Sequence, residues 1–592
     1  MSGRPPTDPG RTLGATGVRI LSTPMTIPEM ILGVCDRPLV SSKTALFTAA
    51  RDANSESLTY EELGAAAGAA AAKLRGLGLE IGDRVALCCE NRPLWGAAYL
   101  GIMTARCVCV PLDSGLGEHE LREILGHSGS NVLVHSDKTA AVCESAAEAL
   151  ERRIKTIPID ALVHLGERRA PRSERPGGPG VNGERQGFSD PASEAVIIYT
   201  SGTTGRPKGV LLSHLNILSN VRSVKKAIRL NETDVFLSVL PLNHTFECTA
   251  GFLAPLSEGG TVGYAPSLSP RELSSAMRAV RPTVMLGVPL LYQKLLSGLD
   301  RAIKRSPAIR RGAARALMGG ARALEPVLGA VPARVLLKGV RAAAGLNRTR
   351  LLISGAAPMP ASIGRSFRSL GLTLVQGYGL TEASPVVAVN RPNAPRDETV
   401  GTPLPGIEIA IDSPNDGPVG EVLVKGENVM LGYYRDPEGT AAVLRDGWLK
   451  TGDLGYIDGD GHLHISGRIK DVIVSSAGKN VYPEEIEEVL LTSPFIEEVI
   501  VVGRSPAGGR GQQPHALVLP DRGAVAAALG SEAADPPEEA VVDSIRKEIR
   551  RLTSGLAEYK RVRGFSLRDE AFPKTGTKKI KRYLFQERDS RV

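Results

Sequence analysis

Residues 195–210 read AVIIYTSGTTGRPKGV, an apolar run followed by a loop rich in glycine and hydroxyl groups. The run AVIIY is typical of a buried strand. Three glycines and five hydroxyl-bearing residues then accompany Lys208, so backbone N–H groups, hydroxyls and one ammonium can wrap a polyphosphate. The loop differs from a Walker P-loop, because Pro207 precedes the lysine and Gly209 follows it. A solvated turn is the alternative, and the length of the segment argues against it.

Strand-like runs continue on both sides of this loop, and helical stretches separate them. The runs are RVALCCE (84–90), CVCVPL (107–112) and NVLVHS (131–136) before the loop, and DVFLSVL (234–240), TVMLGV (283–288), RLLIS (350–354) and LTLVQG (372–377) after it. Such alternation predicts a mainly parallel α/β sheet. From Val400 onward, short strands with Gly/Asp turns indicate a β-rich subdomain.

The predicted fold class is α/β, with a large N-terminal domain of two mixed α/β subdomains plus the β-rich subdomain. A small, mobile α+β C-terminal domain follows. We expect a polar lead-in over 1–24, the large domain over 25–466 and the small domain over 467–592. Residues 171–194 are rich in Pro, Gly and charge and are predicted to form a mobile loop, and 521–540 also resembles a loop.

The positive charge of the chain is concentrated in one segment. The 592 residues carry a net charge of +8, and residues 301–350 hold twelve Lys/Arg against one acid. Apolar positions alternate with the arginines, so we expect helices that contact anionic lipid. A solvated arginine-rich face is the alternative. No nucleic-acid motif or aromatic platform accompanies the segment, so nucleic acid is not an expected partner.

The cysteines and the N-terminus indicate a reducing compartment. The seven cysteines form no CxxC pair, which argues against a disulfide framework and a zinc ribbon. The first residues contain no apolar core of a signal peptide, and the apolar stretch 95–112 is short and interrupted by Arg106. We expect a cytoplasmic protein that touches the inner face of a membrane through the basic segment.

Four later motifs give the loop its context. They are GYGLTE (377–382), GWLKTGDLGYID (447–458), GRIKDVIVSSAGKNVYPEEIE (467–487) and PKTGTKKIKR (573–582). In this order, the set resembles the adenylate-forming (AMP-binding) superfamily over nearly the whole chain. The runs RPTVMLGVPLLYQKL (281–295) and ISGAAPMP (353–360), with the long insertion 293–350, look most like long-chain fatty acyl-CoA synthetases.

The resemblance implies a nucleotide site. Tyr378 would stack on adenine, Asp453 would accept hydrogen bonds from both ribose hydroxyls, and Arg468 would assist beside it. Thr203 and Glu382 would hold Mg²⁺, which prefers hard oxygen ligands. The implied ATP/AMP-binding residues are Thr200, Ser201, Gly202, Thr203, Thr204, Gly205, Lys208, Gly355, Ala356, Gln376, Gly377, Tyr378, Gly379, Thr381, Asp453, Arg468 and Lys579.

The resemblance also implies catalytic and moving parts. The implied catalytic residues are Lys579, Thr203, Lys208 and His244. Lys578 stands where the family pattern has glycine, so the choice between Lys578 and Lys579 as the inward lysine stays open. Lys470 matches the hinge between the domains, and the residues implied for the coenzyme A channel are Ser476, Gly478 and Lys479.

The implied acyl pocket favours an apolar tail. Its residues are His244, Thr245, Leu286, Gly287, Val288 and Gly379. The segments that supply them offer no cation, so we expect a fatty acid, activated with ATP and Mg²⁺ and transferred to coenzyme A. Medium-chain and aryl acids stay open, and His244 could be merely packed. The alternatives are an acyl-AMP ligase that loads an acyl carrier protein and a non-catalytic membrane-binding homologue, and the sequence does not indicate the oligomeric state.

Overall fold

The computed structural model describes residues 25–49, 55–163, 190–201, 207–305, 331–413, 417–475, 479–505, 511–530, 536–575 and 580–586, together with Leu13–Gly14 and the positions 312, 316 and 320. The fold is mixed α/β, with a large domain followed by a small one, as the sequence predicts. Most of the expected loop 171–194 lies outside the described residues.

Both ends of the predicted phosphate loop lie in a seven-stranded sheet. The strand order is β19 (Gly432–Tyr433), β9 (Pro207–Ser213), β8 (Glu194–Ser201), β5 (Val108–Leu112), β4 (Arg84–Cys88), β6 (Val132–His135) and β7 (Lys155–Pro158). Strands β4 to β7 are parallel, whereas β8 and β9 form an antiparallel hairpin in which Thr200 faces Lys208. The hairpin therefore holds both ends of the predicted phosphate loop.

A nine-stranded sheet forms the second α/β subdomain. Its order is β16 (Thr402–Pro403), β15 (Val386–Val389), β14 (Leu374–Gly379), β13 (Leu351–Ser354), β12 (Val284–Gly287), β10 (Val235–Ser238), β11 (Thr261–Tyr264), β2 (Thr44–Thr48) and β3 (Ser57–Thr59). The strands from β2 to β14 in this order pair in parallel. Ligands of such sheets bind beyond the carboxyl ends of the parallel strands.

Helices fill the space between the two sheets. Every residue of α3 (Pro93–Thr104) is buried, which explains its continuous apolar sequence. A Cβ at Gly101 would lie 2.6 Å from Ala70 of α2 (Tyr60–Gly76), so glycine allows the two helices to touch. Further helices of the large domain are α1 (Ile27–Cys35), α4 (Glu118–Ser128), α5 (Ala140–Glu148), α6 (Ile159–Leu162), α7 (His214–Ile228), the π-helix η2 (Phe246–Leu253), α8 (Ala254–Glu258), α9 (Pro270–Val280), α10 (Pro289–Arg305), α12 (Val331–Leu336), α13 (Lys338–Ala343), α14 (Ala361–Ser369) and α15 (Pro437–Val443).

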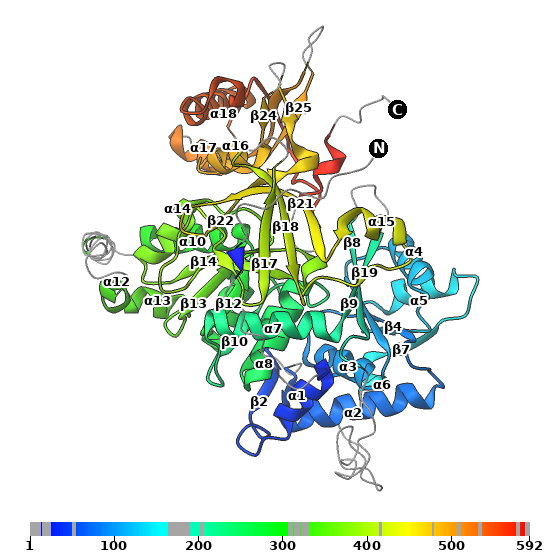
Figure 1. The fold of residues 1–592 in the computed structure, drawn as a ribbon. Helices are drawn as coiled ribbons and strands as arrows, with labels where there is room; N and C mark the ends of the chain where they lie inside the picture. The colour runs from blue at the N-terminus through cyan, green and yellow to red at the C-terminus, as the bar shows by residue number, and fades with distance from the viewer. Residues whose placement is uncertain are drawn as a thin grey trace, which may run out of the picture.

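A β-rich sheet connects the large domain to the small one. Its order is β1 (Leu13–Gly14), β17 (Ile407–Asp412), β18 (Gly420–Gly426), β21 (Trp448–Ile457) and β20 (Leu444–Arg445), and β22 (Leu463–Arg468) pairs with β21. Two residues of the expected lead-in thus join this sheet. In Figure 1 the small domain, coloured orange to red, sits above β18 and β21.

The small domain has its own core. Its strands are β23 (Ile473–Val474), β24 (Asn480–Val481), β25 (Ile496–Arg504), β26 (Gln513–Pro520) and β27 (Gly564–Leu567), and its helices are α16 (Pro483–Leu490), α17 (Arg522–Ala528) and α18 (Glu538–Thr553). Helix α17 corrects the expectation of a loop over 521–540, because Asp521 caps it and Val525 packs into the core. Within the described part of the chain, no helix combines the length and apolar composition needed to cross a membrane.

Candidate active site

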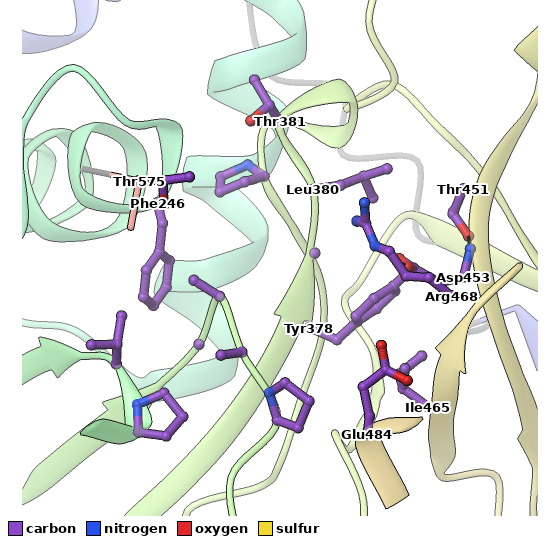
Figure 2. Close-up of a pocket in the computed structure, with 18 of the residues that line it drawn as sticks. Phe246, Tyr378, Leu380, Thr381, Thr451, Asp453, Ile465, Arg468, Glu484 and Thr575 are labelled. Carbon is purple, nitrogen blue, oxygen red and sulfur yellow. Dashed lines mark hydrogen bonds and ion pairs between the residues drawn. The ribbon is translucent and has the colours of Figure 1, made fainter. Parts of the chain in front are cut away.

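One large cleft lies between the two domains. Its volume is about 1940 Å³, and its walls come from the ends of β13 and β14, the β21–β22 hairpin, α16 and the segment at Lys574–Thr575. Figure 2 shows Tyr378, Asp453 and Arg468 on one side of β14 and Phe246 on the other. Strand β14 therefore divides the cleft into two compartments.

Close backbone approaches shape this dividing wall. A Cβ at Gly379 would lie 1.8 Å from the carbonyl oxygen of Pro385, so only glycine fits there. A Cβ at Gly355 would lie 2.9 Å from the ring of Phe246. The next residue, Ala356, has a left-handed φ of 69°. Such strained backbone clusters at binding sites.

A carboxylate, an arginine and a tyrosine form the first compartment. Asp453 on β21 faces Arg468 on β22, and the Asp453 Oδ1 lies 2.9 Å from the Arg468 Nε. The hydroxyl of Tyr378 donates to the Asp453 Oδ2 at 2.7 Å. Burial, and then the Asp453 charge, raise the pKa of Tyr378, so the phenol stays a donor. Each carboxylate oxygen keeps a further lone pair, so Asp453 can still accept hydrogen bonds from a diol.

Lys208 and Glu382, which carry opposite charges, both contact Tyr433. The Lys208 Nζ lies 4.7 Å from the centre of the Tyr433 ring and 3.9 Å from the Asp436 Oδ2. The Tyr433 hydroxyl donates to the Glu382 Oε1 at 3.0 Å. A cation and a carboxylate that line the same cleft can receive a polyphosphate and its metal ion together.

The second compartment begins at His244. This residue precedes η2, and His244, Thr245, Val288 and Gly379 all line the cleft together with Phe246. Leu286 and Gly287 do not appear in the described lining. Leu286 is buried in the core, and Gly287 packs against Tyr292, since β12 ends there and turns its next residue, Val288, toward the cleft.

Comparison with known proteins places this geometry in a family. The model for AMP-binding enzymes matches residues 40–434, and the model for their C-terminal domain matches 485–579. The chain belongs to the AMP-binding enzyme family. This AMP-binding enzyme is 34% identical to a feruloyl-CoA synthase of Amycolatopsis over 79% of this chain and 84% of that one. It is 33% identical to a long-chain-fatty-acid–CoA ligase of Mycobacterium bovis over 74% and 73%. ATP-bound MatB of Rhodopseudomonas palustris shares its fold with a TM-score of 0.71 and 28% identity over 95% and 98%.

The predicted nucleotide residues of this AMP-binding enzyme divide into two groups. Those that line the cleft are Thr200, Lys208, Gly355, Ala356, Gln376, Gly377, Tyr378, Gly379, Thr381, Glu382, Asp453 and Arg468. Outside the described residues lie Gly202, Thr203, Thr204, Gly205, Ser476, Gly478, Lys578 and Lys579, as does the side chain of Ser201. Thus the roles of Thr203 and Lys579, and the choice between Lys578 and Lys579, stay predictions.

The small domain faces the cleft on both sides of the lysine motif. Lys574 and Thr575 precede the motif's undescribed residues, Ile580 to Arg582 follow them, and all five line the cleft. Figure 2 draws Thr575 among the residues that line the same cleft as Phe246 and Thr381. The described residues of the C-terminal motif of this AMP-binding enzyme therefore contribute to the cleft.

The proposed hinge also lines the cleft, next to the end of the C-terminal motif. Lys470 belongs to a short 3₁₀ turn, Ile469–Asp471, which joins β22 of the large domain to the small domain. Arg582 Nε lies 3.6 Å from the Asp471 Oδ2. Lys479 is exposed at the start of β24, where its N–H donates to the Ser475 Oγ.

Three residues of this AMP-binding enzyme were not predicted from the sequence, namely Tyr433, Asp436 and Glu247. Tyr433 and Asp436 lie in GYYRDPE, where an aromatic pair and an acid near a glycine gave a weak signal. Glu247 lies on η2, is 1% exposed and has an Oε2 without a hydrogen-bond partner. Burial raises the pKa of Glu247 to about 8 from its usual 4.5. The carboxyl is therefore largely protonated at neutral pH.

We expect Glu247→Gln to remove a pH dependence of stability. The folded chain holds the Glu247 proton more tightly than the unfolded chain, so the stabilisation is complete below about pH 4.5 and is lost as the pH rises through 8. At pH 8 the glutamine variant should be more stable by as much as about 4 kcal/mol, and at about pH 4, below the unfolded pKa, the difference should nearly vanish. Urea unfolding at both pH values measures this, with exposed Glu408→Gln as the control. Equal effects at the two pH values would contradict it.

Proposed function

We propose that this AMP-binding enzyme is a fatty acid–CoA ligase that accepts a long acyl chain. It would form the acyl-adenylate from ATP and pass the acyl group to coenzyme A. The observation that carries the proposal is a set of aliphatic residues in the lining of the cleft, which we call the aliphatic branch. They come from α7, η2, β15 and the segment before β17, and they are Val224, Ala227, Ile228, Ala250, Val386, Val389 and Leu404.

The chemistry of this branch supports an apolar tail. Its side chains are mostly buried and carry no hydrogen-bonding group. Burial of a hydroxyl or a second carboxylate without a partner is costly, whereas each buried CH₂ contributes about 0.8 kcal/mol. Each added methylene is therefore favourable until the branch is full.

The residues of the cleft fit the adenylation step. Asp453 and Arg468 would hold the ribose, and Lys208 would stabilise phosphate charge. The acid's carboxylate oxygen attacks the α-phosphorus, and pyrophosphate leaves. The chain's part is to align the two and to screen their repulsion. The thiol of coenzyme A then attacks the acyl carbon, loses its proton and displaces AMP.

We propose that a magnesium ion binds in the cleft beside Lys208 and Tyr433. The Glu382 carboxylate lines the cleft beside Lys208 and Tyr433. In the described residues no group of three or more His, Cys, Asp or Glu could hold a metal. Glu382 would therefore bind the ion together with phosphate and water oxygens, the mixed shell that Mg²⁺ prefers. The bound ion would supply charge neutralisation.

Two other readings remain candidates. The similarity to feruloyl-CoA synthase favours an aromatic acid, which would occupy only the entrance of the branch. Transfer to an acyl carrier protein instead of coenzyme A is the second. Replacement of coenzyme A by holo-carrier protein in the same assay distinguishes the acceptors, and absence of ATP–pyrophosphate exchange would indicate a non-catalytic homologue.

We expect AMP release to rise with chain length up to long-chain acids. A panel of C2 to C20 fatty acids and ferulate measures this. Ala227→Phe should block the branch, so that kcat/KM falls at least about tenfold for C16 but changes little for C6 or ferulate. Exposed Ala342→Phe on α13 is the control. Highest activity with ferulate in the wild type, and no loss with C16 in Ala227→Phe, would refute the long-chain assignment.

We also propose that the basic segment 301–350 touches anionic membrane. In its described part, Val335 is 70% and Leu336 40% exposed beside exposed Arg334 and Lys338. Among the basic residues in the described part of the segment, two make contacts inside the fold in addition to Arg334, whose guanidinium donates to Gly371 and Thr373. These are Arg341, which is buried and donates to the carbonyls of Ala333 and Leu370, and Arg350, which pairs with Asp234 at 2.7 Å.

Sedimentation with vesicles tests the membrane contact. We expect more binding to anionic than to neutral vesicles at low salt, with about 1 kcal/mol per basic residue near the surface. The double variant Val335→Ser, Leu336→Ser should weaken binding without lowering turnover of a soluble C8 acid. Equal binding to both vesicle types would exclude an electrostatic contact.

A further inference from the structure

Asn91 forms hydrogen bonds with the segment that follows β10. It lies on the connection between β4 and α3, far from that segment in sequence. Its Nδ2 donates to the Leu240 carbonyl oxygen at 2.6 Å and to the Ser238 Oγ at 3.3 Å. Its Oδ1 accepts from the Leu242 N–H at 2.9 Å. A planar amide with donors and an acceptor in use fixes both the distance and the orientation of its partner.

The segment that Asn91 binds, Leu240–Leu242, leads directly to His244. Between the end of β10 and Thr245 the chain forms turns without a strand or helix. The His244 N–H donates to the Pro241 carbonyl oxygen at 3.2 Å, and the His244 carbonyl oxygen accepts from the Cys248 N–H at 3.0 Å. His244 is thus held between the segment that Asn91 grips and the first turn of η2. A shift of Leu240–Leu242 would move the imidazole within the cleft.

A second buried residue, Ser238, also helps to position this segment. The Ser238 side chain also acts on the Glu247 carboxyl of η2, where it partly offsets the rise in the pKa of Glu247 that burial causes. Asn91 and Ser238 thus connect the β4–α3 segment to β10 through a hydrogen bond, and Ser238 in turn adjoins η2. Hydrogen bonds in a chain of low-dielectric surroundings reinforce one another and keep one geometry.

We infer that Asn91 is a positioning residue for the acid substrate, acting through His244. The inference rests on the proposed function, in which His244 flanks the carboxylate end of the acyl compartment. It assigns to the β4–α3 connection a role in acid binding, although Asn91 does not line the described cleft. Asn91 fixes the imidazole without touching the substrate.

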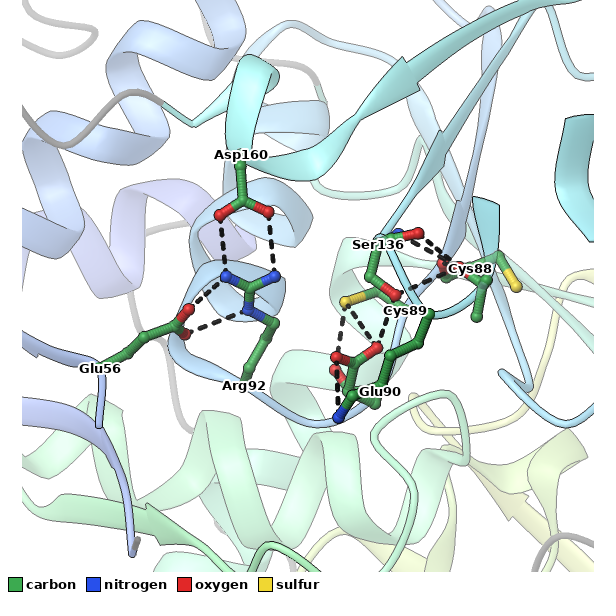
Figure 3. A network of polar contacts seen from close by, with 9 residues as sticks. Glu56, Cys88, Cys89, Glu90, Arg92, Ser136 and Asp160 are labelled. Carbon is green, nitrogen blue, oxygen red and sulfur yellow. Dashed lines mark hydrogen bonds and ion pairs between the residues drawn. The ribbon is translucent and has the colours of Figure 1, made fainter. Parts of the chain in front are cut away.

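The neighbouring residue offers a matched control. Figure 3 shows Arg92 between Glu56 and Asp160. The Arg92 Nη2 lies 2.9 Å from the Asp160 Oδ1, and the ion pairs of Arg92 are with these two acids. Arg92→Gln removes the ion pairs of the β4–α3 connection and should therefore lower the Tm. It should leave the hydrogen bond between Asn91 and Leu240 unchanged.

Steady-state kinetics with separate acid and ATP titrations test the role. Asn91→Asp keeps the acceptor for Leu242 but turns an oxygen toward the Leu240 carbonyl. We expect kcat/KM for the acid to fall about 10-fold to 30-fold while the KM for ATP changes less than about twofold. Ser238→Ala, a milder change that leaves the backbone grip intact, should produce about a threefold loss of the same acid-selective kind. Arg92→Gln should leave both ratios unchanged.

A double-mutant cycle separates positioning from general destabilisation. If Asn91 acts through His244, then Asn91→Asp should cost less than about twofold when added to His244→Ala. Equal losses for acid and ATP, or full additivity with His244→Ala, would overturn the role of Asn91. A wild type that releases AMP with no acid would instead overturn the proposed function, and the role of Asn91 with it.

Discussion

Lys579→Ala is expected to lower acyl-adenylate formation about 10²-fold to 10³-fold while a supplied acyl-adenylate is still converted to acyl-CoA. The reason is that a cation is needed only while negative charge builds up at the α-phosphate. Lys579 itself lies outside the described residues, but Thr575 and Ile580, the described residues of the motif on either side of 576–579, line the cleft. ATP–pyrophosphate exchange measures the first step, and thioester formation from synthetic adenylate measures the second.

Two further variants make this result specific. Lys578→Ala should leave exchange nearly unchanged if Lys579 is the inward lysine. Lys470→Pro, which restricts φ at the hinge, should spare exchange and slow thioester formation, since one small domain must present two different surfaces to the same cleft. If Lys579→Ala slows both steps equally with folding intact, the lysine is structural or shared, and Lys578 is the next candidate.

Asp453→Ala should weaken ATP binding by about 10-fold to 100-fold. The substitution removes the carboxylate that we propose to bind the ribose diol, and it also leaves Arg468 and Tyr378 without their buried partner. Asp453→Asn, which keeps one acceptor, should show a smaller loss. Fluorescence or calorimetric titration with ATP measures the affinity directly, without turnover.

The same hairpin contains a control carboxylate. Asp458 accepts the backbone N–H groups of Asp460 and His462 in the turn between β21 and β22 and does not line the described cleft. Asp458→Asn should therefore destabilise the hairpin with little change in ATP affinity. If both variants weaken ATP binding equally, Asp453 acts through hairpin stability and not through the ribose.

The sequence predicts the parts that repeat a local pattern. The motifs that resemble the family predicted Lys208, Tyr378 and Asp453 as nucleotide residues, and all three line one cleft of the described chain. The pattern could not show which face of a short buried strand meets the cleft, so Leu286 was placed in the pocket although it belongs to the core. Burial of Glu247 depends on the packing of η2, which no local pattern encodes.

The tertiary contacts of Tyr433 illustrate a second limit. Its partners, Glu382 and Lys208, come from two other segments of the chain. The pairing of β19 with β9 brings Lys208 to Tyr433, and the Met430 N–H, which donates to the Glu382 carbonyl oxygen, holds Glu382 beside the same strand. Helix α17 is missed for a different reason. It has seven residues, and only two of them, Val525 and Ala526, are buried, so its periodicity is too short to detect.

The walls of the cleft come from different elements of the chain. The aliphatic branch comes from α7, η2, β15 and the residues before β17, whereas Lys208, Asp453 and Arg468 lie on other strands of the large domain and Lys574 on the small domain. If the branch selects the acid as proposed, a lineage can exchange one acid for another through a few substitutions in α7 or η2 while the residues proposed for adenylation stay untouched. For the same reason, a designer can graft a new acid preference onto this scaffold by rebuilding a single wall.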